Sequence, residues 1–128
     1  MVIHDFYSGF EGEPECRISL ASDRGVEEEL HVWSGYFDAL MASLVTIDGQ
    51  WRGVALHHHA HTGWNELGVR RWTDPDVVDS RRQLEVALMV LTDSRARDSK
   101  AREVGWLWVN LLQRAEAEPS LGVRVEYL

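Results

Sequence analysis

The chain lacks a second cysteine and any long apolar run. Because Cys16 is the only cysteine, it can form neither an internal disulfide nor a CxxC metal or redox motif, and a reducing compartment is expected. The longest uninterrupted apolar run, residues 86–91, is far below the roughly 20 residues needed to cross a bilayer. The N-terminus has no basic region followed by an apolar stretch. These absences predict a cytoplasmic protein without a membrane span or secretion signal.

Positive charge is also scarce. Thirteen basic residues, all arginine except Lys100, stand against 21 acidic ones, which gives a formal net charge of −8 and a pI near 5.1. Such a surface repels phosphate backbones and anionic lipid, so we expect neither nucleic acid nor membrane among the partners. A positively charged protein partner is favoured instead.

What is present is the composition of a folded domain. The 128 residues are 45% hydrophobic and 27% charged, close to the averages of globular proteins. Two independent halves would each be too small to bury a comfortable core. We therefore expect residues 1–128 to form a single domain.

Local patterns predict an α+β fold. Apolar residues recur at three- and four-residue spacing over about 34–46, with Ser34 as N-cap, and over about 99–118. Alternation of apolar and polar residues predicts strands at 17–21 and 121–128. The expected architecture is a single two-layer domain, a mainly antiparallel sheet packed on these two principal helices.

Other segments are less distinct. Residues 1–14 suit a short strand or an ordered arm, and residues 26–33 suit either the start of a helix or a separate strand. Residues 51–59 and 64–72 resemble the two strands of a hairpin. Residues 83–91 fit both helical and strand templates, and their length and polar flanks favour a strand.

A histidine-rich segment offers the clearest chemical hypothesis. In a strand, His57, His59 and His61 would project from one face, and Glu66 across the hairpin could add an oxygen ligand. Imidazole binds zinc and other divalent transition metals, so a metal-dependent enzyme is one interpretation. The alternatives are exposed histidines that bind no cofactor and a pH-sensitive or partner-contacting role.

The same segment resembles the start of the first cupin motif, carried by Gly53, His59, His61 and Glu66 at the family's spacing. The resemblance implies a metal held by the two histidines and the glutamate. It covers only about fourteen residues: Thr73 replaces the closing glycine, and no histidine follows His61 to build the second motif. Cupins are also predominantly β, unlike the helical pattern of 99–118.

Tryptophan beside acidic residues suggests a partner-binding surface. Large rigid aromatic side chains anchor many protein interfaces, and nearby carboxylates would attract a basic partner. Edge packing of the tryptophans and helix entry for the aspartates are the structural alternatives. The candidate contacts are Trp64, Glu66, Trp72, Asp74, Asp76 and Asp79.

Common catalytic motifs are missing. The sequence has no GxSxG elbow, GxxxxGK[ST] loop, GxGxxG after a strand or HExxH helix. Cys16 alternates with apolar residues and is expected to pack as one. The sequence therefore favours an acidic protein-binding domain, such as an immunity- or antitoxin-type inhibitor of a basic partner. A metal enzyme and a self-associating accessory protein are the alternatives.

Overall fold

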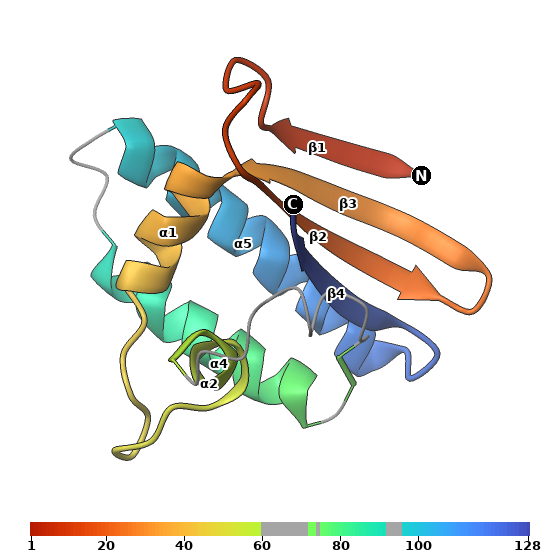
Figure 1. Ribbon diagram of the computed structural model, residues 1–128. Helices are drawn as coiled ribbons and strands as arrows, with labels where there is room; N and C mark the ends of the chain where they lie inside the picture. The colour runs from red at the N-terminus through yellow and green to blue at the C-terminus, as the bar shows by residue number, and fades with distance from the viewer. Residues whose placement is uncertain (60–71, 74, 92–95) are drawn as a thin grey trace.

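The computed structural model describes residues 1–59, 72–73, 75–91 and 96–128. A four-stranded sheet has helices packed on one face, which confirms the α+β prediction. Figure 1 shows the opposite face of the sheet turned toward the viewer, free of helices.

The sheet contains β1 (Val2–Phe6), β2 (Glu15–Ser22), β3 (Gly25–Trp33) and β4 (Gly122–Tyr127), in the order β1-β3-β2-β4. Two of its three pairings are antiparallel, as expected, while β1 runs parallel to β3. The strands predicted at 17–21 and 121–128 are confirmed. The undecided segment 26–33 is a strand.

Helices α1 (Ser34–Ala42) and α5 (Ala96–Ala117) lie against the sheet and confirm the two principal helices. Helix α4 (Asp76–Val90) packs on the side of α5 away from the sheet, and α2 (Gly53–His59) packs on α4 (Figure 1). The cap position of α1 is Trp33 rather than Ser34, without a side-chain cap hydrogen bond. No helix in the described ranges is long and apolar enough to span a membrane.

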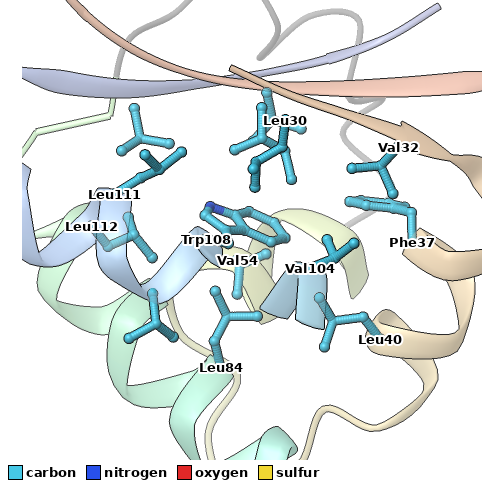
Figure 2. Close-up of a cluster of buried hydrophobic side chains, with 14 of the residues drawn as sticks. Leu30, Val32, Phe37, Leu40, Val54, Leu84, Val104, Trp108, Leu111 and Leu112 are labelled. Atoms are coloured by element: carbon cyan, nitrogen blue, oxygen red, sulfur yellow. The ribbon is translucent and has the colours of Figure 1, made fainter. Parts of the chain in front are cut away.

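Trp108 of α5 lies at the centre of the core. Figure 2 shows its indole between Leu30 of the sheet and Leu84 of α4, with Val54 of α2 nearby. All four residues are buried. Helix α5 contacts the strands on one side and α4 on the other. Cys16 also has an exposed fraction of 0%, which confirms that it packs as an apolar residue.

The strand predicted for residues 83–91 is wrong, because this segment completes α4. Its buried side chains follow helical spacing, as at Leu84, Leu88 and Leu91, whereas Met89 is 85% exposed. A strand would have placed Leu84 and Leu88 on the same face as Val86, which is only half-buried. Packing against α5 thus selects the helical template.

The strand predicted for residues 51–59 is also wrong, because Gly53–His59 form α2. Val54 and Ala55 are neighbours and are both buried, which a helix against α4 allows and strand alternation does not. The Val54 backbone N–H donates to Ser80 Oγ at 2.9 Å and fixes α2 on α4. The second predicted strand, 64–72, lies outside the described residues except for Trp72.

Candidate functional site

The histidine segment does not form the predicted strand face. His57 and His59 belong to α2, where residues two apart are separated by about 200° around the helix axis. His61 and Glu66 lie outside the described residues. Within the described part of the chain, no three His, Cys, Asp or Glu side chains are grouped to hold a metal ion. A zinc site therefore stays a prediction, and the strand on which its ligand arrangement depended is a helix at His57 and His59.

Trp72, one aromatic residue of the predicted partner surface, is not at the surface. Trp72 has an exposed fraction of 0% and belongs to the core, so its assignment as a partner contact is wrong. Asp76 and Asp79 are half-buried in the first turn of α4, where a helix dipole favours carboxylates. The remaining predicted contacts, Trp64, Glu66 and Asp74, lie outside the described residues.

An acidic and aromatic cluster exists elsewhere, around the arm formed by residues 7–14 between β1 and β2. At its start, the Asp5 carboxylate accepts the backbone N–H groups of Tyr7 (2.9 Å) and Ser8 (3.0 Å) and the Ser8 hydroxyl. The Ser8 hydroxyl, together with the two N–H groups, lowers the pKa of Asp5 from 3.8 to about 2. Asp5 is therefore ionised throughout the neutral range.

Short-range hydrogen bonds shape the rest of the arm. The Gly9 N–H donates to both carboxylate oxygens of Glu11, at 3.1 and 3.0 Å, and backbone hydrogen bonds lower the pKa of Glu11. Gly9 and Gly12 turn the chain at φ of +98° and +96°, values that glycine adopts without steric cost. The arm is thus ordered by its own sequence.

Three aromatic rings meet where the arm passes the junction of β3 and α1. The rings of Phe10 and Trp33 stack with centroids 4.0 Å apart and planes 5° from parallel. Tyr36 meets both edge-on, at 5.7 Å from Phe10 and 5.0 Å from Trp33. The Trp33 indole N–H donates to the Glu13 carboxylate at 3.1 Å. A carboxylate is therefore fixed beside a half-buried tryptophan.

Gly35 makes room for this arrangement. A Cβ at residue 35 would lie 2.3 Å from the Trp33 ring, far inside van der Waals contact. The ring therefore occupies the space that any other residue would fill at this position of α1. Gly35 acts as a positioning residue for Trp33.

The arm surface, as the term is used below, combines exposed or half-buried aromatic and acidic side chains. None of its members is cationic, and three are carboxylates. Its negative charge is concentrated beside rings that offer a large, rigid contact area. The arm surface comprises Asp5, Tyr7, Phe10, Glu11, Glu13, Trp33 and Tyr36.

A groove of about 360 Å³ adjoins the arm surface, between the end of β1, the arm and the start of α5. Its walls mix aromatic rings with charged groups. On the α5 side, Lys100 Nζ and Glu103 Oε2 form an ion pair at 3.4 Å. Such a groove can accept a polar or cationic side chain with an apolar stem. It is lined by His4, Asp5, Phe6, Ser8, Phe10, Tyr36, Lys100 and Glu103.

The polar groups of this groove do not form a serine–histidine pair. The Ser8 hydroxyl donates to Asp5, whereas His4 Nε2 is hydrogen-bonded to Glu28 at 2.9 Å. Nucleophilic catalysis by a serine requires a base within hydrogen-bond reach of its hydroxyl. The Ser8 hydroxyl is therefore engaged by a carboxylate rather than by a histidine base.

Sequence reasoning missed the arm surface because Trp33 and Tyr36 are 20 or more residues away from its other members. Hydrogen-bond register brings them together, since Glu15 pairs with Trp33 across β2 and β3. The available signals were aromatic residues in the glycine- and glutamate-rich arm and a glycine two residues after Trp33. In comparisons with family models, curated proteins and solved structures, no match was found for this chain.

Proposed function

We propose that this chain binds a basic protein through the arm surface. The observation that carries the proposal is the Phe10–Trp33 stack with the Glu13 carboxylate held on the indole N–H. Stacked aromatic side chains supply buried contact area, and an adjacent carboxylate supplies a partner for lysine or arginine. Both are features of interface hot spots.

Charge supports this choice of partner. The whole chain carries a net charge of −8, and three of its carboxylates lie in the arm surface, which has no cation of its own. Opposite charges on two proteins speed their encounter and disfavour wrong partners, an effect that salt weakens. The affinity for a basic partner should therefore fall as ionic strength rises.

Order in the arm supports it as well. Asp5, Gly9 and Glu11 fold the arm through local hydrogen bonds, so little conformational entropy remains to be lost on binding. An ordered loop that presents an aromatic residue resembles a binding element more than a passive connection.

The test is affinity capture with the full chain from an extract of the source organism. We expect wild type to capture a basic protein that Trp33→Ala fails to retain, because loss of a hot-spot aromatic weakens binding by roughly 30-fold or more. The matched control is Trp106→Ala, which removes a tryptophan that is 46% exposed on α5 and is not a member of the arm surface. This variant should capture the same protein as wild type.

Equal capture by all three proteins would contradict the proposal. So would a captured partner whose retention depends on Trp106 rather than Trp33. A partner with net negative charge would contradict the charge argument.

Inhibition of a basic toxin, as by an immunity or antitoxin protein, is the specific form of this proposal. Small size and negative charge support that form. If the captured protein is a nuclease, wild type should inhibit it and Trp33→Ala should not. A metal-dependent enzyme gains no support from the described residues, because α2 replaces the strand on which its ligand geometry depended.

A further inference from the structure

The two edges of the sheet differ in what covers them. At the β4 edge, Trp72 and Val123 exchange two backbone hydrogen bonds, at 2.6 and 3.2 Å, so part of that edge is covered. At the other edge, β1 has β3 as its only strand neighbour within the described ranges. In a strand, half of the backbone groups point to each side, so β1 presents donors and acceptors along its outer edge.

Large apolar side chains accompany this open edge. Met1, Val2 and Ile3 are 72%, 53% and 49% exposed. Val2 is paired with Glu28 and Ile3 with Glu29, so the two side chains stand on opposite faces of the sheet. A strand added beside β1 would cover both of them with its own alternating side chains.

The usual protection of an edge strand is weak in β1. Natural edges are shielded by short strands, charged side chains such as lysine, proline or a bulge. β1 carries one exposed carboxylate, Asp5, but it contains neither lysine nor proline, and its pairing with β3 runs without a register shift. Its inward polar side chain, His4, is hydrogen-bonded to Glu28. The edge is therefore suited to accept another strand.

Position and charge indicate what that strand belongs to. β1 leads directly into the arm, and the groove lined by Asp5 and by the Lys100–Glu103 ion pair opens at the same end of the strand. A second copy of this chain also has a net charge of −8, so the two copies would repel each other. A basic segment is instead attracted by the carboxylates around it.

We propose that an extended segment of the basic partner, containing lysine or arginine, adds to the outer edge of β1 as a fifth strand and continues over the arm surface. Main-chain hydrogen bonds to β1 give this segment its affinity, while pockets for alternate side chains give specificity. The inference rests on the proposed function and specifies how the partner is held.

The probe is a peptide about ten residues long with alternating valine and lysine, added to the isotopically labelled full chain. We expect amide hydrogen exchange in Val2–Phe6 to slow by at least about tenfold when the peptide binds. The same peptide with every backbone nitrogen methylated should bind at least about tenfold more weakly, because it cannot donate to the edge. Unchanged exchange in β1, or equal affinity for the methylated peptide, would overturn the inference.

A pair of variants separates edge pairing from simple charge attraction. Ile3→Lys and Met89→Lys each add one positive charge at an exposed apolar residue, but only Ile3 lies on the edge strand, whereas Met89 lies on α4. We expect Ile3→Lys to weaken peptide binding at least about fivefold and Met89→Lys to change it less than about twofold. Equal weakening by both variants would show a charge effect alone and would contradict the fifth strand.

The captured partner distinguishes failure of this inference from failure of the proposed function. Binding that requires Trp33 but is unaffected by Ile3→Lys would retain the function and overturn the fifth strand. Binding that requires neither residue would overturn both. A concentration-dependent dimer of the chain alone, dissociated by Ile3→Lys in sedimentation experiments, would identify a second copy as the occupant and contradict a partner segment.

Discussion

Trp72 and Trp33 lie near opposite edges of one sheet, yet they serve different purposes. Trp72 bonds to β4, stacks on Trp108 with ring centroids 6.1 Å apart, and has no exposed surface. Trp33 ends β3 beside the arm, half-buried, with its indole N–H on a surface carboxylate. A tryptophan beside acidic residues is therefore accessible to a partner only where no other layer covers it.

The largest difference between the two sites should be in stability. Trp72→Ala should lower the free energy of unfolding by about 3–5 kcal/mol, because it leaves a cavity in the core. Trp33→Ala should lower it by about 1–2 kcal/mol, since it removes one surface stack. Urea denaturation followed by circular dichroism measures both. If Trp72→Ala does not fold, Trp72→Phe provides the comparison, and a smaller loss there than for Trp33→Ala would contradict the assignment.

The core also contains a buried side-chain amide whose replacement should stabilise the fold. Gln83 of α4 is fully buried, and neither atom of its amide has a hydrogen-bond partner within the described part of the chain. Gln83→Met should raise the free energy of unfolding by about 1–2 kcal/mol, because an unsatisfied polar group becomes apolar. Gln113→Met, at an exposed position of α5, is the control. A loss of stability for Gln83→Met would show that the amide is satisfied.

On the Trp33 side, a single methyl group should separate binding from stability. Gly35→Ala should displace the Trp33 ring and change the free energy of unfolding by only about 1 kcal/mol, since alanine favours the helix. Affinity for the captured partner should nevertheless fall at least about tenfold. Near-ultraviolet circular dichroism reports the lost aromatic stack. An intact stack or unchanged affinity would contradict the positioning role of Gly35.

The smallest expected effect concerns the charge of the arm. Ser8→Ala should raise the pKa of Asp5 from about 2 toward 3.8, because the Ser8 hydroxyl is the main cause of its lowering. A carboxylate with a lowered pKa stabilises the fold above 3.8 and loses that contribution as pH falls toward about 2. Between pH 3.8 and about 2, Ser8→Ala should therefore lose less folding stability than wild type. Carboxyl nuclear magnetic resonance titration checks it, and an unchanged pKa would contradict the hydrogen bond.

Sequence reasoning succeeded where a pattern was long or clearly periodic. The helix predicted at 99–118 is α5, and the strands at 17–21 and 121–128 lie within β2 and around β4. It failed at 83–91, where a short apolar run fits both periods, and at 51–59, which resembled one strand of a hairpin. In both segments packing decided the outcome, since α2 and α4 bury their apolar residues against each other and against α5.

The arm surface was beyond prediction for a different reason. Trp72, Asp76 and Asp79 are close in sequence and were grouped for that reason, whereas Phe10 and Trp33 become neighbours only when the sheet forms. The parallel pairing of β1 with β3 is a long-range contact without a local sequence signal. The location of the proposed binding surface therefore could not be predicted from the sequence.

Amide hydrogen exchange of the chain, alone and bound to the captured partner, tests the central claim most directly. If the arm surface binds, amides in residues 7–14 and in β1 should exchange at least about tenfold more slowly in the complex, while those of α4 keep their rates. Protection concentrated in residues 72–91, with the arm unchanged, would place the partner on the Trp72 side and contradict the account.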